Sequence, residues 1–221
     1  MSDGKKQPPR FYRIFNNENG FFRIMAVVFD LIELNVLTLL CCVPIVTAGA
    51  SFTAMHNTLW HMVRREEGYV HTHFFKAFRE NFKQATVVWL VCLAVIIVML
   101  GDVAVMGQLD PAFRNMLLVV LVVVGLLALT IAQYYFVFLS RYDNPVKLQL
   151  RNAAMAAIGF FPRTAGMLVV LGAFAFLYAM VFVYVIPFIL LLGIALPQYC
   201  CALLYCPIFE RLEGSAVDER R

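Results

Sequence analysis

Charge is scarce in this chain of 221 residues, because only 14% of them are Asp, Glu, Lys or Arg, whereas 62% are hydrophobic. A soluble globular protein is nearer half apolar and a quarter charged. A core of this size cannot bury such an excess, since small domains leave much of their surface exposed. The composition therefore excludes a soluble enzyme, a disordered chain and a secreted disulfide domain, and it predicts a multi-pass membrane protein.

Motifs that carry catalysis or metal binding are also missing. The sequence has no HExxH, GxSxG or Walker A motif, no carboxylate-rich metal cluster, and no CxxC spacing among its six cysteines. His71 and His73 are one residue apart, but no acid or cysteine stands beside them at ligand spacing. We therefore expect no enzyme activity, metal or cofactor, and we interpret the cysteines as small apolar packing residues.

Long stretches without charge define the spans, because a helix needs about 20 mostly apolar residues to cross a bilayer. Residues 115–140 carry no charge, and residues 164–209 carry none over a length that suits two helices divided at Pro187. We predict an all-α bundle of six spans in one transmembrane domain, residues 22–209, with tails at residues 1–21 and 210–221. The predicted spans are residues 22–43, 47–63, 84–107, 113–139, 164–185 and 188–209.

The distribution of basic residues supports six spans and sets their direction. Of the 18 Lys and Arg residues, 17 fall on one side of this arrangement and only Arg114 falls on the other. By the positive-inside rule that side is cytoplasmic, which predicts a cell-membrane protein with both termini inside the cell. The same rule explains the basic residues without nucleic-acid binding. Residues 47–63 form the weakest span, and a short, tilted or re-entrant helix is the alternative there.

Two segments between spans have the spacing of amphipathic helices, residues 68–83 and 145–158. In the first, Phe78 follows the adjacent Phe74 and Phe75 by four and three positions, Phe82 follows Phe78 by four, and three basic residues lie among them: Lys76, Arg79 and Lys83. We expect both helices to lie along the cytoplasmic headgroups with the aromatic face toward lipid and the basic face toward anionic lipid, and docking to a cytoplasmic partner is the alternative. A weak repeat favours three helical hairpins, although similar interfacial chemistry alone could produce it. The asparagines that mark this repeat are Asn16, Asn81 and Asn152.

Ionisable groups inside a bilayer are costly and should face the bundle interior. The first span carries Asp30, Glu33 and Asn35, and the second carries His56. The helical rise puts Glu33 and His56 at similar depth on neighbouring antiparallel helices, so we predict that they pair, with Asp30 as the alternative partner. Such a pair is either a proton or substrate site or a buried structural bridge. Gln133, near the cytoplasmic end of the fourth span, is expected at the interface.

Pro44, Thr47 and Gly49 mark the start of the second predicted helix. Thr47 is expected to cap this helix, and Gly49 to let a neighbouring backbone approach closely. The alternative is that a short helix begun by proline and glycine frames a binding site at an interrupted segment. Pro187 and Pro197 are candidates for the same role around the sixth span, although Pro187 also suits a simple hairpin turn.

The segment VPIVTAGA at residues 43–50, with Asn35 before it and NFKQA at residues 81–85 after it, resembles the YesL-like family of bacterial integral membrane proteins. The triplets at residues 141–143 (RYD) and 151–153 (RNA) are also similar. The family is described as having no known function, and its members are often encoded beside carbohydrate ABC transporters and glycan-degrading enzymes. The resemblance implies an association of this kind and supplies no catalytic residues.

Three functions are compatible with these features. The first is an accessory or assembly subunit of a carbohydrate ABC transporter, whose partners would be the lipid bilayer and the permease subunits. The second is a small secondary transporter or channel that uses the intramembrane acids and His56. A membrane-embedded enzyme is the third, and the missing motifs disfavour it.

Overall fold

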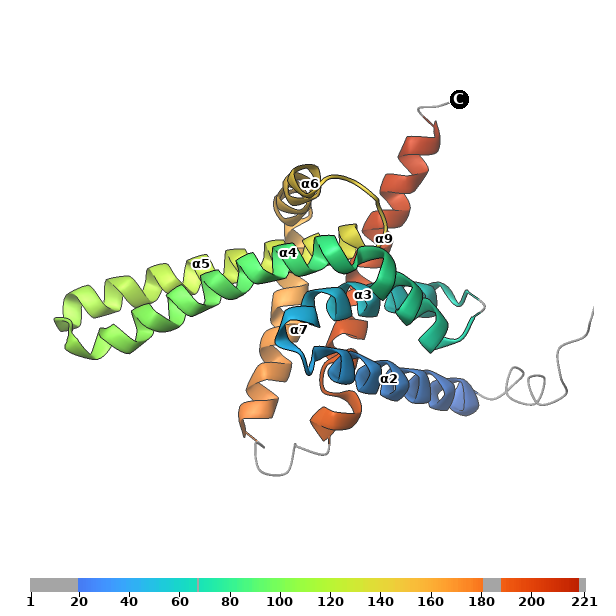
Figure 1. Cartoon of the computed structure of the whole chain (residues 1–221), viewed down its shortest axis with the longest axis horizontal. Coiled ribbons are helices and arrows are strands. Elements are labelled where there is room, and N and C mark those ends of the chain that lie inside the picture. The colour runs from blue at the N-terminus through green and yellow to red at the C-terminus, as the bar shows by residue number, and fades with distance from the viewer. Residues whose placement is uncertain (1–19, 67, 181–187, 219–221) are drawn as a thin grey trace, which may run out of the picture.

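The computed structural model describes residues 20–66, 68–180 and 188–218, and every regular element in these residues is a helix (Figure 1). The predicted all-α class is therefore confirmed. Pro187 and most of the predicted N-terminal tail lie outside the described residues. The helices are α2 (Gly20–Cys42), α3 (Ala48–Arg64), α4 (Val70–Val105), α5 (Pro111–Leu139), α6 (Val146–Gly159), α7 (Phe161–Met180) and α9 (Ala195–Asp218), with short 3-10 turns η1 (Ile45–Thr47) and η2 (Met106–Gln108).

Five stretches of helix are long and apolar enough to cross a membrane, judged by length and composition. Their presence supports the interpretation of the chain as a multi-pass membrane protein, because about 20 apolar residues suffice for one crossing. The five stretches are Ile24–Cys42, Val70–Gln108, Pro111–Leu139, Phe161–Met180 and Phe188–Phe209.

The second predicted span forms α3, which is not among these five stretches. Its 17 residues rise by about 26 Å, which is less than the roughly 30 Å of a hydrocarbon core. The helix packs against α2, α4, α5 and α9, and 11 of its residues are buried by protein. The described residues thus contain five candidate spans by length and composition, and the shorter α3 is packed among them.

Hydroxyl groups make it possible to bury α3, although the helix is partly polar. The hydroxyls of Thr53 and Thr58 each donate to the carbonyl oxygen four residues earlier, at 2.9 Å. The Ser51 hydroxyl donates to the carbonyl oxygen of Thr38 on α2, also at 2.9 Å. These three hydroxyls therefore have partners within the protein, as burial away from water requires, whereas the buried indole N–H of Trp60 has no hydrogen-bond partner among the described residues.

The segment predicted as a separate amphipathic helix is continuous with the third span in α4. Residues 70–100 contain no proline or glycine, so no residue there ends the helix. The expected orientation of its aromatic face is wrong for Phe74 and Phe78. Phe74 is fully buried and Phe78 packs against the core, because α3 covers this side of α4, whereas Phe75 and Phe82 stay exposed.

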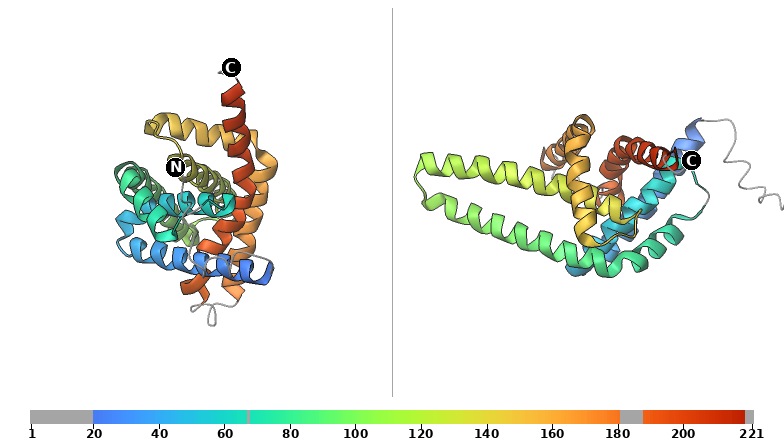
Figure 2. Two further views of the ribbon diagram at one scale, coloured as in Figure 1. Left: turned by 90° about the vertical axis from the view of Figure 1, so that its right-hand side faces the viewer. Right: turned by 90° about the horizontal axis from the view of Figure 1, so that it is seen from above.

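The helices do not share one direction, as the three views show (Figures 1 and 2). α4 and α5 run side by side along the long axis of the molecule, α7 and α9 cross that axis, and α6 runs across both pairs. A flat bilayer that α4 and α5 cross along their length would therefore not be crossed in the same way by α7 and α9. The arrangement is not the simple up-and-down bundle that the sequence suggests.

The far half of the α4–α5 hairpin projects beyond the other helices (Figure 1). Between residues 90 and 129 only Met106 and Leu121 are buried. Valines, leucines and isoleucines cover the remaining surface of both helices, and Ile97, Val98 and Val119 are each more than 60% exposed. We refer to residues 90–129 as the projecting hairpin.

Gly49 sets the distance between α3 and α4. A Cβ atom at this position would lie 2.5 Å from the Cβ atom of Trp89 and 2.6 Å from the carbonyl oxygen of Ala85. Both atoms belong to α4, and the second is backbone, which cannot move aside without shifting the helix. Small residues at membrane helix contacts allow this close approach.

Replacing Gly49 with Ala should therefore lower the stability of the folded protein by about 1–3 kcal/mol, the usual cost of overpacking a tight interface. The matched control is Gly172→Ala on α7, where no atom lies within 4 Å of the added methyl group. Thermal unfolding of the purified variants in detergent measures the difference. Equal melting temperatures for the two variants would contradict the proposed contact.

Candidate functional site

The polar residues of α2 point to different sides of the helix. Asn35 is fully buried, Asp30 is partly buried, and the Glu33 side chain is 45% exposed. The Glu33 carboxylate pairs with the exposed side chain of His71 on α4, with 3.1 Å between Oε1 and Nδ1. Glu33 and Asn35 are two residues apart, which places them on nearly opposite sides of a helix.

The pair predicted between Glu33 and His56 does not form within the described residues. His56 is 1% exposed, and its Nδ1 lies 3.2 Å from the hydroxyl oxygen of Tyr205 on α9. The prediction used depth along the helix axes, and depth does not fix how each helix is rotated about its own axis. In the structure α2 turns Glu33 outward and Asn35 inward.

The side chain of Gln133 on α5 also interacts with the imidazole ring of His56. The Gln133 amide nitrogen donates to the side-chain oxygen of Gln198 on α9 at 3.1 Å. Gln133 is 8% exposed, so protein covers its side chain, and its expected depth at the membrane interface stays a prediction. Tyr205, His56, Gln133 and Gln198 form a connected series that we call the core polar chain. Tyr205 and Gln198 do not stand out in the sequence, because their neighbours are mostly apolar.

The side chain of Asn35 pairs the backbone groups at a break in the last apolar helix. Residues 188–192 are helical, residues 193 and 194 form a turn, and α9 then begins at Ala195. The Asn35 amide nitrogen donates to the carbonyl oxygens of Ile189 and Leu190 at 3.0 and 2.8 Å. Its side-chain oxygen accepts from the backbone N–H groups of Ile194 and Ala195, each at 2.9 Å. One side chain thus pairs backbone groups on both sides of the break, which helix ends otherwise leave unpaired.

Pro197 accounts for the position of this break. Proline has no N–H to donate to the carbonyl four residues earlier, and its ring clashes with that carbonyl. The carbonyl concerned belongs to Gly193, and it accepts instead from the Tyr178 hydroxyl of α7 at 2.8 Å. A Cβ at Gly193 would lie 2.5 Å from the Cα of Ile189, so this turn needs glycine. Of the two places considered for an interrupted segment, the second and the sixth predicted spans, the sixth has a break, and Pro197 lies beside it.

Thr47 occupies the residue before α3, as predicted, but its hydroxyl acts on the preceding segment. The oxygen lies 2.6 Å from the carbonyl oxygen of Cys41 and 2.8 Å from that of Pro44. No side-chain hydrogen bond from Thr47 reaches the N–H groups of α3. Thr47 thus pairs carbonyl groups at the end of α2, where the exposed Pro44 turns the chain into η1.

The histidines near the start of α4 contact different partners. His71 pairs with Glu33, whereas the ring of His73 stacks on His61 with 4.1 Å between ring centroids. The six cysteines are free. In the parts of the chain that the structure describes, no three His, Cys, Asp or Glu side chains gather as metal ligands.

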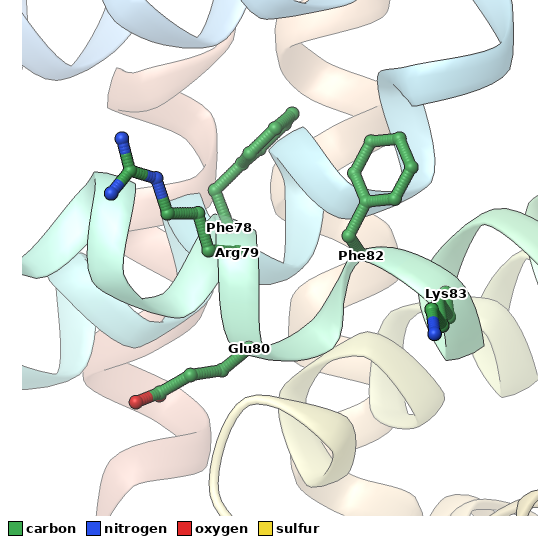
Figure 3. Close-up of a pocket in the computed structure, with 5 residues that line it drawn as sticks. All are labelled: Phe78, Arg79, Glu80, Phe82 and Lys83. Atoms are coloured by element: carbon green, nitrogen blue, oxygen red, sulfur yellow. The ribbon is translucent and has the colours of Figure 1, made fainter.

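The two best-formed depressions of the described surface are open and shallow. One lies on α4 and is lined by Phe78, Arg79, Glu80, Phe82 and Lys83; Figure 3 shows Phe78 and Phe82 on one side of the helix and Glu80 on the other. The second lies between α7 and the break, where Tyr178, Gly193 and Pro197 line it beside Gln198 of the core polar chain. Both depressions are too open to enclose a small molecule.

A family model described as "Protein of unknown function, DUF624" matches residues 31–103. No curated protein and no solved structure matches the chain significantly. The matched residues run from α2 to the end of α4 and include Asn35, Gly49 and His56. The chain is therefore similar over this segment to proteins whose function is unknown, and the narrower likeness to YesL-like proteins stays a prediction.

Replacing Asn35 with Leu should destabilise the fold by about 3 kcal/mol or more, since each buried group left unpaired costs about 1–3 kcal/mol. The matched control is Thr38→Val on the same helix, because the Thr38 hydroxyl bonds only to a carbonyl of its own helix. Thermal unfolding measures the stability, and hydrogen exchange at the Ile194 and Ala195 amides reports the break directly. Unchanged protection of these two amides in Asn35→Leu would contradict the assigned role.

Proposed function

We propose that the chain is a membrane-embedded accessory subunit that assembles with the permease subunits of a carbohydrate ABC transporter. Five apolar helices support the membrane class. The resemblance to YesL-like proteins supports the choice of partner. In this proposal the protein lies in the cell membrane and catalyses no reaction. The short α3 carries the chain back across the membrane inside the bundle, which gives an even number of crossings and leaves both termini in the cytoplasm, as the distribution of basic residues favours.

The projecting hairpin is the observation that carries the assembly role. It extends beyond the helices of its own chain, so partner helices can approach it from several sides (Figure 1). Gly101 lies on this hairpin, and no atom of the chain is found within 4 Å of the place where its Cβ would be. Glycine in a helix costs about 1 kcal/mol relative to alanine, and close packing of a partner helix would offset that cost.

Gly101→Ile tests this role, because the added side chain fills the space where a partner helix would approach, and its Cβ meets no atom outside the local helix backbone. We expect the variant to keep its thermal stability and to recover permease subunits at least about tenfold less well, a change equivalent to roughly 1.4 kcal/mol of binding free energy. The measurement is a pull-down of the tagged full-length protein from native membranes in mild detergent.

Gly172→Ile on α7 is the matched control, since a Cβ atom there also meets no atom within 4 Å outside the local helix backbone. This control should recover permease subunits as the wild type does. Recovery of the bait alone from wild-type membranes would refute the assembly role. Full recovery by Gly101→Ile would show that the hairpin is not the docking element.

A second candidate function is a small secondary transporter or channel, and the core polar chain favours it. Ionisable groups buried in a membrane protein often mark ion or substrate paths, and interrupted helices often frame the binding site. His56 is such a group, and Gln198 connects it to the depression beside the broken helix. In this function His56 would carry the proton and Tyr205 would orient its ring, with Asp30 and Glu33 of α2 as further acid groups.

Proteoliposomes that contain the purified full chain test the second candidate. Under it, the wild type should move protons or sugar, His56→Gln should abolish the flux, and Tyr205→Phe should reduce it. His71→Gln is the matched control, because His71 is exposed and lies outside the core polar chain. Absence of flux in wild-type vesicles would exclude this candidate and leave the assembly role standing.

A further inference from the structure

The first part of α4 presents an outward face on which basic and aromatic side chains lie in adjacent rows. Phe75 and Phe82 are seven residues apart, as are Lys76 and Lys83, and Arg79 lies between the two rows; all five side chains are exposed. A separation of seven residues is nearly two helical turns, which keeps each pair on one side of the helix. The opposite side carries Phe74 and Ala77 and is buried in the core.

α6 repeats this pattern. Gln149, Ala153 and Ala156 form its buried side. On the outer side Lys147 and Arg151 are exposed in the first two turns, and Met155 and Ile158 are exposed further along, with Ile158 at 79%. The outward side of α6 is thus basic at its beginning and apolar toward its end.

The cations on these two helices have no ion-pair partners within the described residues, where the recorded ion pairs are those of Glu33 and Glu66 with His61, Arg64 and His71. Two exposed acids lie nearby, Glu80 on α4 and Asp143 before α6. Figure 3 shows that Glu80 leaves the helix on the side away from Phe82. We call the five cations the basic belt: Lys76, Arg79, Lys83, Lys147 and Arg151.

One hydrogen bond joins α4 to the segment before α6 and so connects the two halves of the basic belt. The Gln84 amide nitrogen, next to Lys83, donates to the carbonyl oxygen of Asn144 at 2.9 Å, two residues before α6 begins. Beyond Gln84 the outward face of α4 becomes apolar, with Val87, Leu90 and Val91 exposed. Lys83 therefore lies at the boundary between the polar surface and the apolar, lipid-compatible surface of α4. Close to this boundary α6 begins, and it runs across the direction of α4 and α5 (Figures 1 and 2).

We propose that the basic belt binds the headgroups of anionic phospholipids, with the exposed apolar side chains of α4 and α6 inserted beside them. Unpaired Lys and Arg groups complement phosphate charge, and apolar side chains beside them suit the boundary between headgroups and acyl chains. Two features favour a lipid layer over an acidic protein as the binding partner. Lys83 lies where the apolar surface of α4 begins, and α6 runs across the direction of α4 and α5. A protein partner would not need the basic residues to stand at the start of the apolar surface.

The test compares the binding of phosphatidylglycerol and phosphatidylcholine with identical acyl chains to the purified full chain, by native mass spectrometry from mild detergent. The wild type should retain phosphatidylglycerol preferentially. Lys147→Gln combined with Arg151→Gln should lower this preference by more than about tenfold, given about fivefold for each cation near an anionic surface. Lys76→Gln with Lys83→Gln should do the same, and added salt should weaken the wild-type preference.

Arg114→Gln is the control, because Arg114 is exposed at the far end of the projecting hairpin and should leave the preference unchanged. Thermal unfolding of the variants should match the wild type, since the substituted side chains are exposed and unpaired. A wild-type preference retained after all five substitutions would overturn the proposal. An unchanged lipid preference with loss of a co-purifying acidic protein would overturn it too, and would assign the basic belt to that protein.

Discussion

The backbone groups around the turn at Gly193 must be paired inside an apolar protein, and the amide of Asn35 meets most of that requirement. Four of its hydrogen bonds, at 2.8–3.0 Å, join α2 to both sides of the break in the last apolar helix. In lipid or in a dry core an unpaired backbone group is costly, so a broken helix persists only where the protein supplies partners. Tyr178 supplies one more, at the carbonyl that Pro197 leaves without a donor. The break therefore fixes the contact between α2, α7 and α9, and it sets where α9 begins on its way past α3.

Most amide side chains of the described interior act in the same way, as partners of backbone carbonyls. Asn57, Gln84 and Gln149 donate to carbonyl oxygens of residues 140–144, and so they hold the connection between α5 and α6 from three different helices. His56 differs, because its recorded partners are the side chains of Tyr205 and Gln133. Backbone pairing explains why the amides are present. Backbone pairing does not explain why the imidazole of His56 and the phenol of Tyr205 are buried together. For this reason the transport candidate centres on His56.

Helix positions followed from the sequence wherever charge, proline or glycine marks an end. Residues 113–139 and 145–158 were predicted as helical, and the structure has Pro111–Leu139 and Val146–Gly159. The role of α3 could not be predicted in this way, because an apolar composition suits contact with protein as well as contact with lipid. The inward position of Asn35 followed from the cost of burying a polar group, but its partners lie more than 150 residues away. Gly193 and Pro197 were the local signal for that contact, since proline removes a donor and glycine permits the tight turn.

The segment that matches the family model cannot pair its own polar groups. Asn35 and His56 lie within residues 31–103, whereas their partners belong to α5, α9 and the turn before α9. The matched helices alone would leave an amide and an imidazole unpaired in apolar surroundings, so the smallest unit that satisfies them includes the second half of the chain. The two groups differ in one respect. Removing Asn35 leaves backbone groups behind that no substitution can remove, whereas His56 and Tyr205 could both be replaced by apolar residues of similar shape at little cost in stability. Structural need therefore accounts for Asn35 fully and for the His56–Tyr205 pair only in part, which makes that pair the place where an activity beyond assembly would be found.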